Sequence, residues 1–143
     1  MNIDEAKAYL YGEGRFNGGK ANHKVLRDIL EALGNPDEGR KKIHIVGTNG
    51  KGSVAAYSAY ILAAAGYKVA QYSSPDIYRF GERMRILDGR SSNKDWSKDP
   101  KVGEISDEDL CKYLNRTRAV VDNMDIPHEL QPNYFDFLLL VAF

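Results

Sequence analysis

The seven residues from Gly47 to Ser53, Gly-Thr-Asn-Gly-Lys-Gly-Ser, have the types and the spacing that phosphate binding requires. Glycines let the backbone wrap closely around an anion, and the amide N–H groups at the start of a helix attract negative charge. Lys51 can reach the outer phosphates of a nucleotide, and the Ser53 hydroxyl can be a ligand of a Mg2+ ion that bridges them. The predicted nucleotide-binding residues are Gly47, Thr48, Asn49, Gly50, Lys51, Gly52 and Ser53.

The spacing of this loop departs from the common P-loop pattern GxxxxGK[ST]. Its first glycine lies three residues before Gly50, and Gly52 separates Lys51 from Ser53. A simpler alternative is a glycine turn that carries a solvated lysine. That alternative accounts for Gly47 and Gly50, but it does not account for a lysine and a serine together at the start of a helix.

A strand and a helix must hold such a loop between them. Ile43 to Val46 is short and β-branched, which is typical of a buried parallel strand, and Ser53 to Ala65 is an alanine-rich helix that ends at Gly66. Tyr67 to Tyr72 alternates as a second strand. Strand, turn, helix and strand form one βαβ unit, so the predicted fold class is α/β, with a P-loop-containing, mostly parallel sheet flanked by helices.

The remaining segments predict two more helices and a third strand. Asn22 can cap a helix that Gly34 ends, and its apolar residues follow the 3.6-residue period. Ser106, with Asp109 three residues later, can open another helix. Met84 to Leu87 is a possible strand, and the polar stretch 91–103 favours a surface loop.

The last segment, Asn133 to Phe143, starts with a capping residue and then runs apolar without a stop signal. An apolar face of this kind needs cover, because exposed apolar patches promote association. We therefore interpret residues 1–143 as one incomplete domain. Its length is enough for a single core and too short for a second full domain.

Composition narrows the class of partner. Lysine plus arginine and aspartate plus glutamate number 20 each, so no overall field attracts nucleic acid or an anionic membrane. Cys111 is the only cysteine, and the sequence contains no apolar run of the roughly 18 residues that cross a bilayer. We expect a cytoplasmic protein with small-molecule partners, no nucleic acid and no membrane.

The string GTNGKGS also resembles the ATP loop of the Mur ligase superfamily, and its flanks resemble the folate branch of that superfamily, the folylpolyglutamate and dihydrofolate synthases. Four other stretches are similar to family segments in the same order: LEALGNP at 30–36, YSSPDIYRFGERMRI at 72–86, EISDEDL at 104–110 and NYFDF at 133–137. The resemblance covers nearly the whole chain. It implies an incomplete Mur-ligase-type central ATPase domain, comprising about the first third of a family enzyme and lacking the C-terminal ligase domain.

The resemblance implies an ATP-dependent ligase of folate biosynthesis and one-carbon metabolism. Such an enzyme joins L-glutamate to a folate, or to dihydropteroate, through an acyl phosphate, with ATP and Mg2+ as cofactors. Lys51 and Ser53 are then the catalytic residues. The implied metal ligands are Ser53, Ser74 and Asp136, and the implied substrate-binding residues are Pro75, Arg79, Phe80 and Arg83.

Two positions depart from the family pattern. Asp136 stands where the family usually has glutamate, and Asp76 follows Pro75 where many members have histidine or an apolar residue. Without the resemblance, Asp136 is a solvent-facing polar position, and the Arg-Phe-Gly-Glu-Arg stretch at 79–83 is a solvated charged turn.

Two other functions stay open at this point. A truncated P-loop domain can bind a nucleotide without turning it over, and we expect residues 1–143 to be inactive by themselves. A peptidoglycan-precursor ligase shares the phosphate loop, but it should lack the serine-proline loop and the Glu-Arg pair at 82–83. The sequence does not separate dihydrofolate synthesis from polyglutamylation.

Overall fold

The structure is a computed structural model that describes residues 2–12, 22–92, 96, 98–99 and 101–143. The chain forms two compact units, which are described separately. The first unit consists of residues 1–40 and 107–143, and the second consists of residues 41–106. Among the described residues, no helix is both long and apolar enough to cross a membrane.

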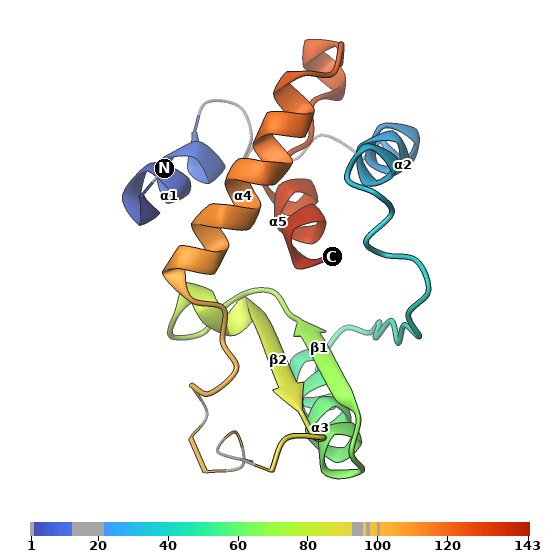
Figure 1. Cartoon of the computed structure of the whole chain (residues 1–143), viewed down its shortest axis with the longest axis vertical. Helices are drawn as coiled ribbons and strands as arrows, with labels where there is room; N and C mark the ends of the chain where they lie inside the picture. Colours follow the sequence, from blue (N-terminus) through green and yellow to red (C-terminus); the bar gives the residue numbers. More distant parts are fainter. Residues whose placement is uncertain (1, 13–21, 93–95, 97, 100) are drawn as a thin grey trace. The chain divides into compact units, whose positions relative to one another are not determined.

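The first unit is made of helices (Figure 1). The long helix α4 (Asp107–Asp122) contacts α1 (Ile3–Tyr11), α2 (His23–Ala32) and α5 (Tyr134–Ala142), and a short 3-10 turn, η3 (His128–Leu130), precedes α5. Large apolar side chains from all four α-helices are fully buried in this unit. They include Leu10, Ile29, Leu110, Leu114, Val121, Phe137 and Leu138.

Asparagine side chains start three of these helices. The Asn22 side chain accepts hydrogen bonds from the backbone N–H groups of Lys24 and Val25 at the start of α2. Asn2 and Asn133 each form a reciprocal capping box, with Glu5 and Asp136 respectively. These side chains bind the N–H groups that lack a partner in the first helical turn.

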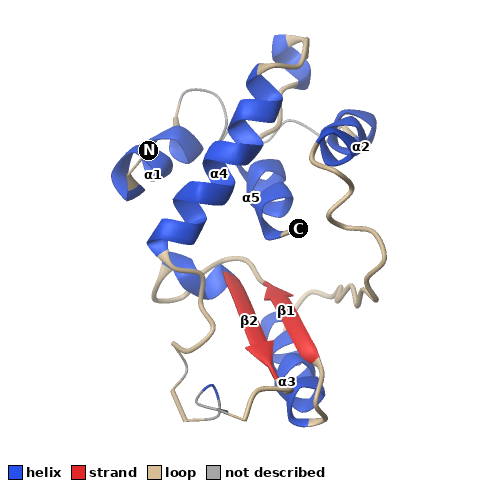
Figure 2. Cartoon of the chain, in the orientation of Figure 1, coloured by secondary structure: helices blue, strands red, loops and turns tan. Residues whose placement is uncertain are grey.

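The second unit pairs one helix with a small antiparallel sheet (Figure 2). Strand β1 (Lys68–Tyr72) pairs with β2 (Met84–Asp88) in the register Lys68↔Asp88 to Tyr72↔Met84, and the 3-10 turn η1 (Phe80–Arg83) leads into β2. Helix α3 (Lys51–Ala64) packs on both strands. Its small core consists of Ala59, Ala63, Leu87 and Trp96, with Tyr60, Val69 and Val102 packed against it.

The predicted helices and the strands at 67–72 and 84–87 are confirmed as α2, α3, α4, α5, β1 and β2. The predicted strand at 43–46 is wrong. These residues form no strand, and Ile43 and Val46 are 67% and 76% exposed. The mostly parallel sheet is not observed among the described residues, because the only strands there, β1 and β2, run antiparallel. A buried parallel strand needs neighbours on both sides, and no strand in the described part of the chain pairs with this segment.

Trp96 also differs from the prediction. The stretch 91–103 is predicted as a polar surface loop, and Lys98, Asp99 and Lys101 are indeed exposed, but Trp96 is buried in the core of the second unit. Residues 93–95, 97 and 100 of this stretch lie outside the described residues.

Candidate functional site

The predicted phosphate loop lies at the amino end of α3. Gly50 is the N-cap residue, with φ of 75° in the left-handed region, where an L side chain is strained. Among the residues that the structure describes, no side chain forms a capping hydrogen bond at this helix end. The backbone N–H groups of its first turn therefore lack the acceptor that Asn22 and Asn133 supply for α2 and α5.

Lys51 folds back over the loop. Its Nζ donates to the carbonyl oxygens of Gly47, at 2.7 Å, and Thr48, at 3.1 Å. The loop residues and Ser53 are exposed on the surface of the unit. An exposed ammonium group beside an uncapped helix end suits a polyphosphate, so these residues fit the nucleotide that the sequence predicts.

The serine-proline loop follows β1, and Arg83 connects its parts. The Arg83 Nε donates to Asp76 Oδ1 at 2.7 Å, and the guanidinium also forms an ion pair with this carboxylate. Arg83 Nη1 donates to Ser74 Oγ at 3.4 Å, and its Cζ lies 5.5 Å from the centre of the Phe80 ring. The Arg83 side chain is only 7% exposed. Ser74, Asp76, Phe80 and Arg83 thus form one cluster.

Tyr72, the last residue of β1, lies beside this cluster. Burial raises the pKa of the Tyr72 hydroxyl, although the positive charge and the hydrogen bond of Arg83 act against that rise. Tyr72 therefore stays neutral at ordinary pH. Asp76 and Arg83 are the members of this cluster that carry opposite formal charges, and they form an ion pair.

Arg79 is held by two glutamates. Glu104 binds its guanidinium, with Nε at 3.1 Å and Nη2 at 2.7 Å from the carboxylate oxygens. Glu82 accepts from the backbone N–H of Arg79 at 3.3 Å. The sequence predicts Arg79 as a substrate-binding residue and indicates no role for Glu104. No spacing rule identifies Glu104, which lies 25 residues from Arg79.

Asp136 lies in the first unit, at the third position of α5. Its Oδ2 accepts from the Asn133 N–H at 3.0 Å, and the residue is 7% exposed. Asp136 is therefore buried, and the alternative interpretation that it faces the solvent is wrong. Burial raises the pKa of the Asp136 carboxyl, and the Asn133 hydrogen bond and the charge of His23 oppose that rise.

The predicted metal ligands are divided between the units. Ser53 and Ser74 belong to the second unit and Asp136 to the first. Neither unit by itself therefore contains all three residues, and their common role as Mg2+ ligands stays a prediction. Within the described part of the chain, no three histidine, cysteine, aspartate or glutamate side chains gather as a metal site. Hydroxyl and carboxylate oxygens remain suitable Mg2+ ligands.

Comparison with known proteins finds relatives of this chain among the folylpolyglutamate and dihydrofolate synthases. No protein-family model matches it. The folylpolyglutamate synthase of Lacticaseibacillus casei is 43% identical over 86 residues, which are 60% of this chain and 20% of the relative. The dihydrofolate synthase/folylpolyglutamate synthase of Bacillus subtilis is 30% identical over 139 residues, which are 97% of this chain and 29% of the relative. The chain thus spans less than a third of the length of these relatives.

Solved structures give the same result. The folylpolyglutamate synthetase of Lactobacillus casei superposes with a TM-score of 0.78 and 31% identity, over 99% of this chain and 32% of that chain. A folylpolyglutamate synthase in complex with AMPPCP and folate superposes with a TM-score of 0.74 and 30% identity, over 99% and 31% of the two chains. These Mur-ligase-type neighbours are consistent with the predicted α/β fold class. By sequence and by structure, the chain is a homologue of part of the folylpolyglutamate and dihydrofolate synthases.

Proposed function

We propose that this chain is part of an ATP-dependent ligase that forms a C–N bond between L-glutamate and a folate through an acyl phosphate. The observation that carries the proposal is the exposed phosphate loop at the uncapped end of α3, in a chain homologous to folylpolyglutamate synthases. A related structure that contains an ATP analogue and folate supports the choice of substrates. Dihydropteroate is the alternative acceptor of glutamate, as in dihydrofolate synthases.

In this proposal the loop from Gly47 to Ser53 binds ATP. The backbone N–H groups at the start of α3 bind phosphate oxygens, and Lys51 exchanges its bonds to Gly47 and Thr48 for bonds to the outer phosphates. Mg2+, when bound, supplies positive charge that neutralises the phosphates during transfer to the substrate carboxylate. Ser53, Ser74 and Asp136 are the proposed oxygen ligands. ADP leaves when the carboxylate takes the terminal phosphoryl group of ATP. The amine of glutamate then attacks the acyl carbon and loses a proton, and inorganic phosphate leaves as the C–N bond forms, so no nucleophile from the protein is required.

The serine-proline loop is the proposed substrate loop, which we define as residues 74–83. Pro75 and Phe80 supply apolar contacts, and Arg79 and Arg83 supply positive charge for a substrate that carries carboxylates. Arg83 is paired with Asp76. We therefore expect Arg83 to contact the substrate with donors that this pair leaves available, without breaking the pair. Arg79, at 39% side-chain exposure, is the more accessible of the two arginines.

The proposal also includes several features of the whole protein that the described residues do not show. These are a P-loop-containing, mostly parallel sheet in the whole protein, residues 1–143 as part of its ATP-binding domain, and a further ligase domain. They also include a cytoplasmic location with small-molecule partners and neither nucleic acid nor membrane. The alignments with the two relatives support the proposed further domain, because this chain covers only 20% and 29% of their lengths.

The first test is ATP binding to this chain, measured by calorimetry with and without Mg2+. We expect Mg2+-dependent binding that weakens about tenfold or more in Lys51→Ala, because a charge-assisted contact to phosphate is lost. Lys41→Ala, an exposed lysine of the same unit outside the loop, is the matched control and should bind as the unchanged chain does. Equal affinity in both variants would refute the assignment of Lys51.

A nucleotide-binding module without turnover is the competing function. It predicts the same calorimetric result and no folate binding, whereas the ligase proposal predicts that folate binds as well. We expect no glutamate-dependent release of ADP from residues 1–143 alone. Such release from this chain would show that the chain itself is a complete enzyme.

A further inference from the structure

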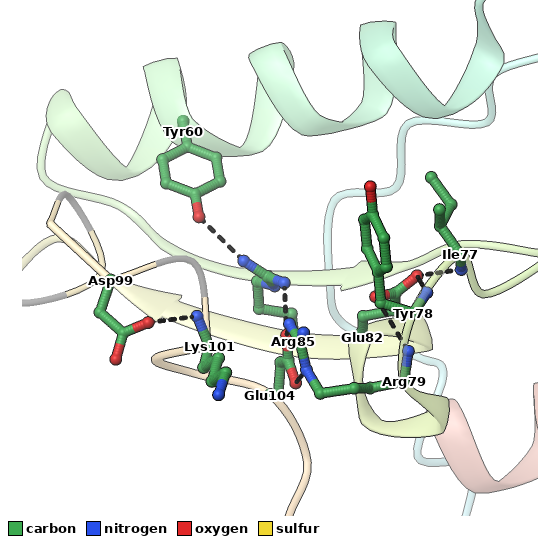
Figure 3. Close-up of polar contacts among 9 residues, drawn as sticks. All are labelled: Tyr60, Ile77, Tyr78, Arg79, Glu82, Arg85, Asp99, Lys101 and Glu104. Carbon is green, nitrogen blue, oxygen red and sulfur yellow. Dashed lines mark hydrogen bonds and ion pairs between the residues drawn. The ribbon is translucent and has the colours of Figure 1, made fainter.

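One carboxylate in the second unit binds two arginines (Figure 3). Glu104 Oε2 accepts from Arg79 Nε at 3.1 Å, and Oε1 accepts from Arg79 Nη2 at 2.7 Å. The second contact shares Oε1 with Arg85 Nη2, which lies at 3.0 Å. The two bonds to Arg79 are the paired, planar arrangement that fixes the orientation of a guanidinium as well as its position.

The backbone places Glu104 with little freedom. Residues 103–105 run beside β2, where the Ile86 N–H donates to Gly103 O and the Ile105 N–H donates to Met84 O, both at 2.8 Å. Arg85 and Glu104 are directly opposite each other in this pairing. The Glu104 side chain is 11% exposed. Its carboxylate is therefore a fixed feature of the sheet edge.

Gly103 makes this close pairing possible. Its φ is +86°, and a Cβ atom at this position would lie 2.3 Å from the carbonyl oxygen of Ile86. Gly81 lies close to the same segment, since its Cβ would lie 2.9 Å from the Ile105 carbonyl oxygen. Both positions need a residue without a side chain, so the sequence is adapted to bring Glu104 against β2 and the turn before it.

The main chain of Arg79 is fixed as well. The Glu82 carboxylate accepts from three successive backbone N–H groups, those of Ile77, Tyr78 and Arg79, as Figure 3 shows. Burial raises the pKa of Glu82, but these hydrogen bonds outweigh burial, so the pKa lies below its ordinary value. Arg79 is thus bound at both ends, by Glu82 at its backbone and by Glu104 at its guanidinium.

The second arginine connects this cluster to α3. Arg85 Nη1 donates to the hydroxyl of Tyr60 at 2.9 Å, and the ring of Tyr60 packs edge-on against Trp96 with 5.6 Å between centroids. The Arg85 side chain is 12% exposed. Glu104 is therefore supported from β2 and, through Arg85, from the helix that begins at the phosphate loop.

We propose that Glu104 is a positioning residue of the substrate loop, which holds the Arg79 guanidinium in one orientation for an anionic group of the substrate. This inference rests on the proposed function of that loop. A guanidinium has five N–H donors, and Glu104 occupies two of them along one edge. The other donors of a guanidinium held in this way meet a carboxylate without the entropy cost of first ordering a long side chain.

The first experiment observes the Arg79 side chain directly in the 143-residue chain. In a 1H–15N NMR spectrum near neutral pH, we expect a sharp Arg79 Nε–H signal, because the paired bonds slow both exchange with water and rotation. Glu104→Gln should broaden or abolish this signal. The matched control, Glu31→Gln, changes an exposed glutamate of α2 and should leave it in place. A signal that survives unchanged in Glu104→Gln overturns the proposal.

The second experiment separates orientation from general stability. Folate and AMPPCP binding are measured by calorimetry on the same variants. Glu104→Gln should raise the Kd for folate about tenfold and leave the Kd for AMPPCP unchanged, because Arg79 faces only the folate in this assignment. An unchanged Kd for folate, or an equal loss for both ligands, contradicts a positioning role.

A further variant keeps the proposal testable if Glu104→Gln does not fold. Arg79→Lys keeps the positive charge and leaves the Glu104–Arg85 pair intact, but a lysine cannot form two parallel bonds. We expect a stable protein with the same weaker folate binding. Folate binding like that of the unchanged chain would show that orientation does not matter. If the unchanged chain binds no folate at all, the proposed function fails, while the NMR comparison still decides whether Glu104 holds Arg79.

Discussion

The two compact units of the chain are stabilised by different kinds of contact. The first unit buries large apolar side chains, among them Tyr134 and Phe137 at 2% and 0% exposure. The second unit has a small core and leaves many large apolar residues exposed, among them Ile43, Val46 and Tyr78, while its loops are fixed by arginine–carboxylate pairs. The difference indicates that apolar burial stabilises the first unit and that directed polar contacts stabilise the loops of the second unit. Four variants test this contrast, starting with the largest expected effect.

Phe137→Ala should produce the largest loss of stability. Phe137 is fully buried and meets the ring of Tyr9 edge-on, with 5.4 Å between centroids. Truncation leaves a cavity and should lower the free energy of unfolding by about 3–5 kcal/mol. Urea denaturation followed by far-UV circular dichroism measures this loss. Leu139→Ala, on the same helix but 37% exposed, is the control and should cost much less; similar losses would show that α5 has no distinct buried face.

Gly103→Ala should damage the second unit by a backbone clash. Its Cβ would lie 2.3 Å from Ile86 O, in addition to the strain of a positive φ, so we expect a loss of about 2–4 kcal/mol. Gly66→Ala has φ of +93° with open space around the added atom, and it should cost about 1–2 kcal/mol. Thermal unfolding of both variants gives the comparison. Equal melting temperatures would mean that segment 103–105 moves away from β2 without cost.

Asp76→Asn removes the charge that pairs with the buried Arg83. An arginine at 7% side-chain exposure then keeps only weaker partners, and we expect a loss of about 1–3 kcal/mol. Asp122→Asn is the matched control, because its pair with Arg118 is about half exposed on both sides and should contribute less than about 1 kcal/mol. Chemical denaturation measures both, and equal losses would contradict a special role for Asp76.

The smallest expected effect is a pH dependence local to the substrate loop. The pKa of Glu82 is lower in the folded chain than in the unfolded chain, so its contribution to stability is present above the unfolded value and disappears as the pH falls through the folded value. Amide exchange at Ile77, Tyr78 and Arg79 should therefore accelerate below about pH 4, beyond the intrinsic trend. In Glu82→Gln this extra acid step should be absent. A step that persists in the variant would assign it to another carboxylate.

Local signals in the sequence predicted much of the secondary structure. Helices α2 and α5 have an asparagine cap and an apolar pattern within a few residues, and both are confirmed. Helix α1 was not predicted, although Asn2 and Glu5 form a capping box that is visible in the sequence. The segment at 43–46 shows the limit of such signals, because a strand exists only where another strand pairs with it.

The candidate site also contains one part that local sequence signals predict and one part that they do not. The phosphate loop was predicted because its residues are consecutive and all of them lie at the start of one helix. The contact between Glu104 and Arg79 joins positions 25 residues apart through the pairing of β2 with segment 103–105. No periodicity or motif in the sequence encodes that pairing, so Glu104 becomes visible only in the folded unit.

The position of Trp96 has a practical consequence. It is the only tryptophan in the chain, and it is buried in the core of the second unit. Intrinsic fluorescence therefore follows the unfolding of that unit, whereas most of the far-UV circular dichroism comes from the helices of the first unit. Denaturation curves recorded with these two probes will coincide if the chain unfolds in one step, and they will separate if the second unit melts independently of the helical unit.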